Sequence, residues 1–304
     1  MNTGLAGHVA LHPYLKQGQI DVDQMLDAYL PKEDKEPLFY EAIRYSLFAG
    51  GKRLRPSLCL ATTEAVGGKR DAVLPFACAL ELVHTYSLVH DDLPAMDNDA
   101  LRRGKPTSHK VYGEGTAILV GDALLTAAFT LIAQKSLQTA SNHKAVLEAI
   151  FELGSAAGLD GMVWGQFMDM QSEGKKTMNE QGLESIHKHK TGALIRASVR
   201  IGGIIGQATP TQLTNLTAYG EQVGLAFQIV DDILDIMGDE KELGKKIAQD
   251  QLKEKWTYPR LVGLKKAQED ANRLSALAIN ALDSFGVSAD PLRWIAAYAV
   301  NRKN

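Results

Sequence analysis

The chain has 304 residues, of which 45% are hydrophobic and 23% are charged, and its formal net charge at pH 7 is -3. This balance is typical of a soluble protein with a sizeable core, and it lacks the basic excess that usually accompanies nucleic-acid binding. No apolar run approaches the roughly 20 residues of a membrane span, and no signal peptide is evident. Cys59 and Cys78 fit no zinc spacing, so we expect a cytoplasmic protein without disulfides.

Helix-period segments are long and frequent along the chain, whereas period-two runs of β-branched residues are few. Several of these segments are apolar on most faces, and no linker or repeat separates them. We therefore expect an all-α fold with a buried helical core, formed by a single domain over residues 1–304. The main helices are expected over residues 72–93, stopped by Pro94; over 115–137; over 178–208, interrupted near its glycines; and over 211–237, with Gly238 as a stop.

Residues 90–99, HDDLPAMDND, contain four aspartates: Asp91, Asp92, Asp97 and Asp99. Carboxylates this close repel one another unless water, a cation or basic side chains compensate them. A proline at position 94 is expected to end the preceding helix, which allows a loop to fold Asp97 back toward Asp91. The first cluster is therefore predicted to combine a helix end with a loop.

Residues 231–235, DDILD, form a second acidic cluster inside an expected helix. Asp231 and Asp235 share a face at i and i+4, and Gln228 lies close to the same line. Mg²⁺ prefers oxygen ligands, commonly one or two carboxylates together with substrate phosphates. Each cluster alone is equally compatible with a solvated acidic turn or helix end, but both directly follow strongly apolar helix segments. Together they favour two metal-binding clusters that face each other across a helical bundle.

Basic residues that suit a polyphosphate accompany the acidic clusters, although each group alone is also explained by an exposed turn, by charge balance or by solvation. Arginine forks suit bidentate contacts to phosphate oxygens. Gln166 and Asp169 share a helix face and are expected to play a supporting role, and Gly161 and Gly165 permit close helix approach. The basic groups are Lys52, Arg53 and Arg55 in GGKRLRP; Arg102 and Arg103 in LRRG; Lys190, beside Thr191, in HKHKTG; and the lysines of residues 243–259.

The motifs GGKRLRP, HDDLPAMDND…LRRG, HKTGALI, GLAFQIVDDILD and LGK…TYP together resemble the five signature regions of trans-polyprenyl diphosphate synthases. Their order and spacing agree with that family over residues 42–259, which is most of the chain. The form DDLPAMD, with two extra residues in the first motif, resembles bacterial farnesyl diphosphate synthases most closely. Two aspartate motifs combined with matching basic motifs make the resemblance specific.

The resemblance implies an isoprenoid-synthase-type bundle of packed helices around a central cavity, and a homodimer. It also implies a Mg²⁺-dependent reaction, with several ions bridged by the substrate diphosphate. In that reaction dimethylallyl or geranyl diphosphate ionises, isopentenyl diphosphate attacks the carbocation head to tail, and loss of a proton gives farnesyl diphosphate. Metal ions and cations stabilise the leaving diphosphate, and a dry apolar cavity protects the carbocation from water.

The resemblance also assigns roles to residues through the matching motifs. The residues expected to bind isopentenyl diphosphate are Lys52, Arg53, Arg55, His84 and Arg103. The residues expected at the allylic diphosphate are Arg102, Lys190, Thr191 and Gln228, which form the catalytic set, and Lys245 and Lys255. The C-terminal residues 301–304, NRKN, are expected to cover the pocket. The residues expected at the metal site are Asp91 and Asp97 of the first cluster as Mg²⁺ ligands, with Asp92 hydrogen-bonding nearby, and Asp231 of the second cluster, with Asp232 and Asp235 in support.

Two residues on the helix below Asp91 are expected to set the product length. Four or five helical residues correspond to a depth of roughly 6–7.5 Å, which places Ser87 and Tyr86 under the metal site. In the family, a bulky residue five positions before the first aspartate limits elongation, and Tyr86 fits a farnesyl product. Helical geometry turns Tyr86 about 140° away from Asp91, so a core aromatic packed between helices is the alternative.

Three departures from the family pattern are present: Asn98 in the first loop, and Ala248 and Trp256 where glycine and serine are usual. The last two bear on the conformation of the loop around residues 245–255. Alternative functions are a sister enzyme that makes geranyl or geranylgeranyl diphosphate, and a non-catalytic prenyl-synthase-like subunit. A terpene cyclase shares the metal chemistry but generally lacks an isopentenyl diphosphate site. A purely structural acidic protein leaves the matched basic residues unexplained.

Overall fold

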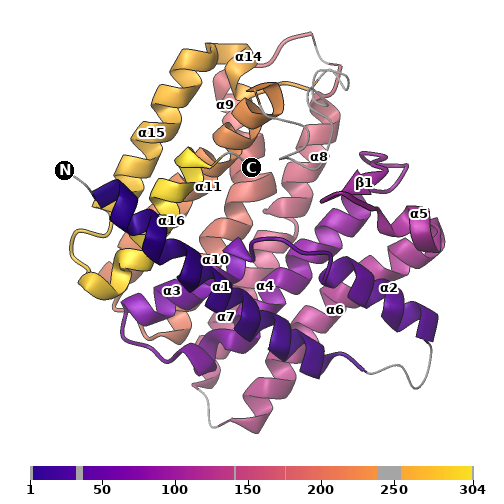
Figure 1. Ribbon diagram of the computed structural model, residues 1–304, viewed down its shortest axis with the longest axis horizontal. Coiled ribbons are helices and arrows are strands. Elements are labelled where there is room, and N and C mark those ends of the chain that lie inside the picture. Colours follow the sequence, from indigo (N-terminus) through magenta and orange to yellow (C-terminus); the bar gives the residue numbers. More distant parts are fainter. Residues whose placement is uncertain (1–2, 32–36, 140–141, 175, 238–254, 303–304) are drawn as a thin grey trace.

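The computed structural model of the protein describes residues 3–31, 37–139, 142–174, 176–237 and 255–302. Within these ranges the fold is almost entirely helical (Figure 1), which confirms the all-α prediction. The prediction of one domain over residues 1–304 stays a prediction. The elements are α1 (Thr3–Tyr29), α2 (Pro37–Leu47), α3 (Leu54–Ala65), α4 (Arg70–Asp91), β1 (Leu101–Arg102), β2 (Lys105–Pro106), α5 (Ser108–Tyr112), α6 (Glu114–Gln138), α7 (His143–Ala157), α8 (Met162–Ser172), α9 (Glu180–His187), η1 (Lys188–Gly192), α10 (Ala193–Ile205), α11 (Pro210–Met237), α14 (Tyr258–Val262), α15 (Leu264–Asn280), η2 (Val287–Ala289) and α16 (Asp290–Asn301).

The expected helices are present, with shifts of a few residues at their ends. Helix α4 ends at Asp91, two residues before the predicted end, and α6 and α11 agree with their predictions to within one residue at each described end. The predicted helix over 178–208 is divided into α9, η1 and α10. The predicted stop at Gly238 lies outside the described residues.

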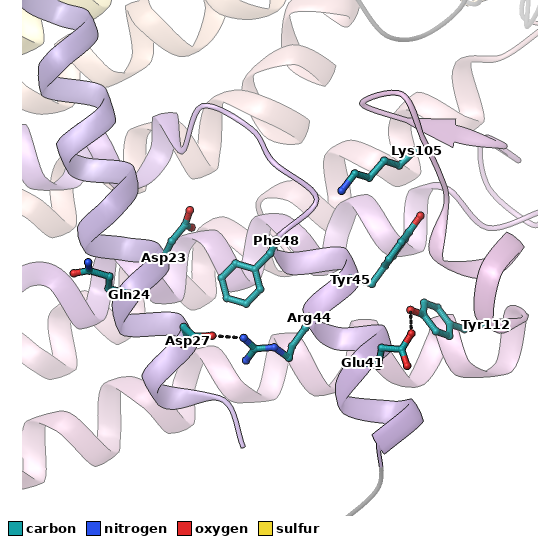
Figure 2. A pocket seen from close by; sticks show the side chains of 9 residues that line it. All are labelled: Asp23, Gln24, Asp27, Glu41, Arg44, Tyr45, Phe48, Lys105 and Tyr112. Carbon is teal, nitrogen blue, oxygen red and sulfur yellow. Dashed lines mark hydrogen bonds and ion pairs between the residues drawn. The ribbon is translucent and has the colours of Figure 1, made fainter. Parts of the chain in front are cut away.

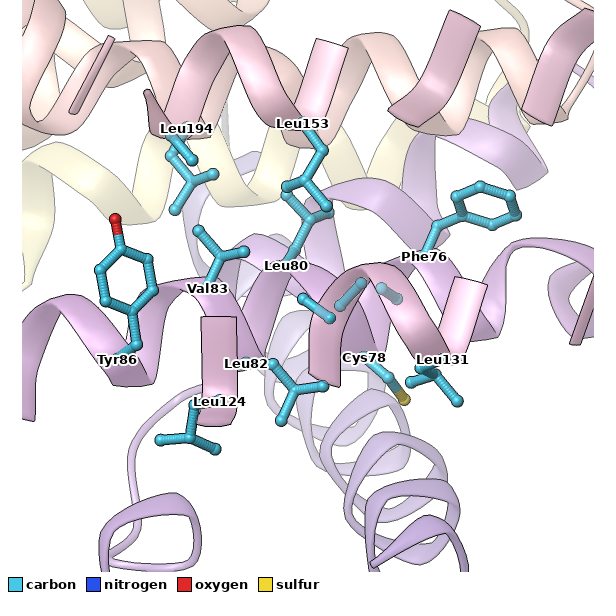
Figure 3. Packing of buried hydrophobic residues seen from close by; sticks show 14 of the residues in the cluster. Phe76, Cys78, Leu80, Leu82, Val83, Tyr86, Leu124, Leu131, Leu153 and Leu194 are labelled. Atoms are coloured by element: carbon cyan, nitrogen blue, oxygen red, sulfur yellow. The ribbon is translucent and has the colours of Figure 1, made fainter. Parts of the chain in front are cut away.

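Helices α4 and α10 form the centre of the bundle. Helix α4 packs against α3 and α6, and α10 packs against α3, α7 and α11. Leu80 of α4 points toward Leu153 of α7, whereas Leu82 points to the opposite side, where Leu131 of α6 lies (Figure 3). All four side chains are fully buried, and each contributes about 1.5–3 kcal/mol of hydrophobic stabilisation. This packed layer fixes the helix that carries the first acidic cluster.

Two helices, α4 and α6, are long and apolar enough to cross a membrane by length and composition alone. The apolar window of α4 is 72% buried inside the protein, as expected for a core helix, and that of α6 is 39% buried. Because core helices of soluble proteins pass the same test, this is weak support for a membrane span. It corrects the expectation that no apolar segment approaches that length, while the expected absence of a transmembrane segment stays a prediction.

The segment η1 is a π-helical turn that carries Lys190 and Thr191. Turns of this type are rare and frequently occur at functional sites. Two glycines let neighbouring helices contact the backbone of η1. A side chain at Gly165 of α8 would collide with it, because its Cβ would lie only 2.1 Å from the backbone nitrogen of Lys190. A Cβ at Gly224 of α11 would lie 2.8 Å from the Cα of Gly192. The close approach predicted for Gly165 is therefore confirmed, and it places η1 between α8 and α11.

Candidate active site

A cavity of about 730 Å³ opens between α4, α6, α8, η1 and α11. Its polar side chains come from the motifs singled out in the sequence, and its apolar side chains come from the surrounding helices. The polar lining is Arg55, His84, Ser87, His90, Asp91, Arg102, Arg103, Gln166, Lys190, Thr191 and Asp231. The apolar and aromatic lining is Tyr86, Leu88, Leu93, Ala95, Met96, Ile118, Met162, Val163, Phe167, Met170 and Phe227.

The first acidic cluster has the predicted combination of a helix end and a loop. Helix α4 ends at Asp91, and the backbone N–H of Asp97 donates a hydrogen bond of 2.8 Å to the carbonyl of Asp91. The predicted return of Asp97 toward Asp91 is confirmed. Asn98 has a φ of 53°, in the left-handed region that asparagine tolerates better than most residues. The departure at Asn98 is therefore compatible with the loop.

The two adjacent aspartates of this cluster have different surroundings. Burial raises the pKa of Asp91 to about 6, because Lys190 offsets only part of the burial effect and Asp97 adds repulsion. Asp92 is buried and accepts hydrogen bonds of 2.8 and 3.0 Å from Nε of Arg102. Asp91 thus faces the cavity with incomplete charge compensation, whereas the carboxylate of Asp92 orients the arginine predicted to bind the allylic diphosphate.

Asp169 holds the two lysines of the predicted allylic site. Lys190 Nζ lies 2.7 Å from its carboxylate, and Lys255 Nζ lies 3.4 Å from the same oxygen. Burial alone would raise the pKa of Asp169, but Lys190 and Lys255 lower it below the usual value. Lys255 also lies 3.1 Å from Asp97 of the first cluster. The sequence predicted only a supporting role for Asp169, and the i+3 spacing from Gln166 did not indicate this pairing.

The second acidic cluster divides between the cavity and the protein interior. Asp231 lines the cavity, whereas Asp232 and Asp235 are 4% and 3% exposed and do not line it. Asp232 accepts hydrogen bonds from Gln228 Nε2 at 3.1 Å and from the backbone N–H of Tyr258 at 2.8 Å. Asp232 and Asp235, like Asp92, do not line the cavity, so their carboxylates are placed to support the metal site and not to ligate the ion directly.

Asp232 also orients the residues predicted near the developing positive charge. Thr191 donates a hydrogen bond of 2.7 Å to Oε1 of Gln228, whose amide nitrogen donates to Asp232. Nε2 of the buried His187 lies 3.4 Å from the other oxygen of Asp232. This chain of contacts fixes which end of the Gln228 amide faces Thr191.

The predicted isopentenyl diphosphate residues have three different settings. Arg55, His84 and Arg103 line the cavity, and the buried Nε of Arg55 has no hydrogen-bond partner among the described residues. Lys52 instead lines a smaller cavity of about 430 Å³, with its ammonium 5.4 Å from the ring centroid of Tyr298. An unpaired guanidinium nitrogen next to an imidazole and a second arginine suits an anionic group.

Arg53 has a different role from the predicted one. Its guanidinium is buried and forms ion pairs with Glu81 at 2.7 Å and Asp23 at 2.8 Å. It also donates a hydrogen bond of 2.7 Å to the carbonyl of Leu47. The backbone of Arg53 is left-handed, with a φ of 47°. These contacts indicate that Arg53 fixes the loop between α2 and α3. They do not place its side chain at a substrate.

Tyr86 lines the cavity, with its ring edge-on to His90 at a centroid distance of 5.8 Å. The ring projects on the same side of α4 as Val83, toward Leu194 (Figure 3). Although helical geometry separates Tyr86 from Asp91 around the axis, both line the same cavity. Ser87 lines it as well, but donates its hydroxyl hydrogen to the carbonyl of His84 at 2.8 Å.

A second cavity of about 680 Å³ lies between α1, α2 and α5 (Figure 2). None of the predicted site residues lines it. Several of its charged side chains are paired within the protein, as Arg44 bonds to Asp27 and the hydroxyl of Tyr112 donates a hydrogen bond of 3.0 Å to Glu41. The predicted chemistry is therefore assembled at the larger cavity.

Several residues named in the remaining predictions lie near or beyond the ends of the described ranges. Lys245 and Ala248 lie outside the described residues. Trp256 packs under Arg260, whose guanidinium carbon is 4.3 Å from the ring centroid. Arg302, which was not selected individually from the sequence, bonds to Asp231 at 2.6 Å. No motif spacing could have identified this contact, because it joins the chain's C-terminal segment to α11.

The carboxylates at the cavity suit a hard divalent cation shared with a diphosphate. Asp91 and Asp231 line the cavity from two helices, and Asp97 lies beside Asp91. Oxygen-only donors of this kind suit Mg²⁺, which keeps several waters and binds substrate phosphates. In the described part of the chain, no three histidine, cysteine or acidic side chains converge to hold a metal by themselves. The donor set therefore fits Mg²⁺ only together with oxygens supplied by the ligand.

Comparisons with known proteins agree with this geometry. The family model described as polyprenyl synthetase matches residues 36–284. The chain is 46% identical over 290 residues to the heterodimeric geranylgeranyl pyrophosphate synthase large subunit 1 of Arabidopsis thaliana, covering 93% of this chain and 77% of that protein. It is 44% identical over 292 residues to the geranylgeranyl diphosphate synthase of Cyanophora paradoxa, covering 96% of both proteins.

A solved structure described as an FPP/GFPP synthase from Zymomonas mobilis superposes with a TM-score of 0.85. It is 39% identical in sequence and covers 96% of this chain and 99% of its own. The agreement of fold, family model and relatives extends over nearly the whole chain. The chain therefore belongs to the polyprenyl synthetase family and is a prenyltransferase that acts as a head-to-tail prenyl diphosphate synthase.

Proposed function

We propose that the protein is a Mg²⁺-dependent geranylgeranyl diphosphate synthase. It condenses isopentenyl diphosphate with allylic diphosphates, head to tail, until the product reaches the geranylgeranyl length. The reaction class is supported by the cavity, whose lining contains Asp91, Asp231, several cationic side chains and many apolar side chains. The product length is supported by relatives of 44–46% identity that are named geranylgeranyl diphosphate synthases.

The cationic side chains of the cavity would hold the departing diphosphate. Burial alone would lower the pKa of Lys190, but Asp169 and Asp91 raise it, so the ammonium stays charged. Lys255 and Arg102 are fixed by carboxylates at 3.1 Å and 2.6 Å respectively. Preorganised cations stabilise charge that develops as the allylic C–O bond breaks. When bound, Mg²⁺ would neutralise further diphosphate charge, held by Asp91, Asp97 and Asp231.

The carbocation left by ionisation would lie between Thr191, Gln228 and the apolar wall. The hydroxyl oxygen of Thr191 and the amide oxygen of Gln228 lie 2.7 Å apart, and both belong to a chain anchored by Asp232. Oxygens of this kind stabilise positive charge without forming a covalent bond. Met162 and Phe167 of α8 and Phe227 of α11 line the cavity and exclude water from the reacting carbons.

The isopentenyl diphosphate would bind at Arg55, His84 and Arg103. Burial and the neighbouring Arg55 and Arg103 lower the pKa of His84 well below its usual value. A neutral imidazole can donate one hydrogen bond to a diphosphate oxygen without adding a third positive charge. The homoallylic double bond then attacks the carbocation, and the adduct loses a proton to give the elongated allylic diphosphate.

A farnesyl diphosphate synthase is the second candidate, and the position of Tyr86 favours it. The buried ring lines the cavity that Asp91 also lines. A bulky side chain there shortens the space for the growing tail.

The predicted homodimer and cytoplasmic location are also proposals. Leu119 of α6 and Phe151 of α7 are exposed, and a second copy of the chain could cover them.

Product analysis tests this proposal. Purified protein is given isopentenyl and dimethylallyl diphosphates, with Mg²⁺ or with a chelator, and the products are separated by chain length. We expect geranylgeranyl diphosphate only with the metal. Asp91→Asn and Asp231→Asn should each lower turnover by about 100-fold or more, whereas Asp122→Asn, at an exposed position of α6, should not. Farnesyl diphosphate as end product would favour the second candidate, and no product from folded protein would contradict both.

A further inference from the structure

The C-terminal end of the described chain contacts the second acidic cluster directly. Nη2 of Arg302 lies 2.6 Å from Oδ1 of Asp231 and donates a hydrogen bond of 2.8 Å to the carbonyl of Phe227. The guanidinium carbon also lies 3.7 Å from the centroid of the Phe227 ring. Three contacts thus fix one planar group against α11, and they identify Arg302 as part of the site and not as a solvated terminal residue.

The burial of the two partners is unequal. The Arg302 side chain is 7% exposed, whereas the Asp231 side chain is 41% exposed and lines the cavity. The aromatic face, the carbonyl and the carboxylate together compensate the buried guanidinium. The carboxylate, in contrast, remains accessible from the cavity. A cation that arrives through the cavity can therefore reach Asp231, but it meets a carboxylate oxygen that already accepts a charge-assisted hydrogen bond.

A contact from α16, the helix that directly precedes Arg302, supports a link between this segment and substrate binding. Tyr298 precedes Arg302 by four residues, and its ring centroid lies 5.4 Å from the ammonium of Lys52. Helix α16 ends at Asn301, so Arg302 follows it directly. One short C-terminal segment therefore contacts a predicted isopentenyl diphosphate residue and the cavity carboxylate of the second cluster.

We propose that Arg302 is a positioning residue that acts through Asp231. It orients the Asp231 carboxylate when no metal is bound, and it competes with the divalent cation for that carboxylate. The inference rests on the proposed function in one respect, which is that Asp231 binds the cation. A role limited to anchoring the C-terminus predicts no effect of Arg302 on metal affinity, so the two explanations are separable.

Metal binding in the absence of substrate tests this inference. Mn²⁺ is titrated into the full-length protein, and free Mn²⁺ is measured by electron paramagnetic resonance. Because a charge-assisted hydrogen bond is lost from Asp231, we expect Arg302→Met to bind Mn²⁺ about tenfold more tightly. Arg302→Lys retains the charge but not the planar fork, and should give a smaller shift. Arg273→Met removes a guanidinium from the exposed face of α15 and should leave the affinity unchanged.

Two outcomes would overturn the inference, and they differ in what they mean for the function. If Asp231→Asn weakens Mn²⁺ binding while folded Arg302→Met binds as the wild type does, Arg302 is only an anchor and the proposed function stands. If Asp231→Asn leaves Mn²⁺ binding unchanged, the assigned role of Asp231 fails, and the inference fails with it. Circular dichroism and thermal melting establish folding, and Arg302→Lys provides the result if the methionine variant does not fold.

Discussion

The carboxylate of Asp232 accepts a hydrogen bond of 2.8 Å from the backbone N–H of Tyr258, three residues after Lys255. This contact attaches the segment that carries Lys255 to α11. Because Lys255 in turn lies 3.1 Å from Asp97, Asp232 positions a cation at the opposite acidic cluster. The second aspartate of the DDILD motif thus organises the site from inside the protein, while the first aspartate faces the cavity.

Replacing the two adjacent aspartates should therefore affect stability and turnover to different extents. Asp232→Ala leaves buried donors of Gln228 and Tyr258 without an acceptor, and we expect it to lower the free energy of unfolding by about 1–3 kcal/mol. Asp231→Ala removes one partner of the buried Arg302 guanidinium, which keeps the Phe227 carbonyl and ring, so we expect a smaller loss of about 1 kcal/mol together with the loss of most of the turnover. Urea unfolding and steady-state kinetics on both variants check this. Equal losses of stability would contradict the assignment.

Tyr86→Ala should give products longer than those of the wild type. Removing the ring enlarges the cavity on the side of α4 that also carries Val83 and faces Leu194 (Figure 3). The variant should also lose about 3–5 kcal/mol of stability, because a buried aromatic is deleted. Product chain length is measured by chromatography, with Tyr112→Ala at the second cavity as the matched control. An unchanged product from folded Tyr86→Ala would exclude Tyr86 as the floor.

The titration of His84 should contribute a loss of stability as the pH falls below about 6.5, and below about 6 the protonation of Asp91, whose pKa is raised in the folded state, opposes it. Burial and the neighbouring arginines lower the pKa of His84 in the folded state. Below the unfolded pKa, the unfolded chain therefore binds a proton that the folded chain does not, and the free energy of unfolding falls by at most about 1.4 kcal/mol per pH unit. His84→Asn should flatten this dependence between pH 6.5 and the lowered pKa, measured by urea unfolding. His143→Asn, at an exposed position, should leave it intact.

The exposed apolar side chains of α6 and α7 should lie in a dimer interface. Leu119→Glu or Phe151→Glu places a charge where a second copy is expected to pack, so each should shift the protein toward monomer. Sedimentation velocity gives the mass in solution. Leu277→Glu on α15 makes the same chemical change at another exposed position and should remain dimeric. A wild-type protein that sediments as a monomer would contradict the proposed assembly.

Much of the fold and the first acidic cluster could be predicted from sequence because local signals determine them. Helix periodicity is a local signal, and Pro94 restricts the residues around it, so the end of α4 and the return of Asp97 followed from neighbouring residues alone. Close helix approach at Gly165 was predicted for the same reason. The π-helical turn at η1 was not predicted, since it depends on packing between α8 and α11.

The roles of adjacent charged residues could not be separated from the sequence. Asp231 and Asp232 differ by about 100° around the helix axis, and only the tertiary packing decides which of them faces the cavity. Arg53 and Arg55 differ similarly, one in a buried ion pair and the other at the cavity. The contacts of Asp169 with Lys255 and of Arg302 with Asp231 join segments far apart in sequence.

The most direct test of the proposed function supplies farnesyl diphosphate as the only allylic substrate, together with isopentenyl diphosphate and Mg²⁺. A geranylgeranyl diphosphate synthase must add one isoprene unit to that substrate. We expect geranylgeranyl diphosphate to form, and to be absent when the metal is chelated. Failure to extend farnesyl diphosphate, by protein that extends dimethylallyl diphosphate under the same conditions, would contradict the proposed product length.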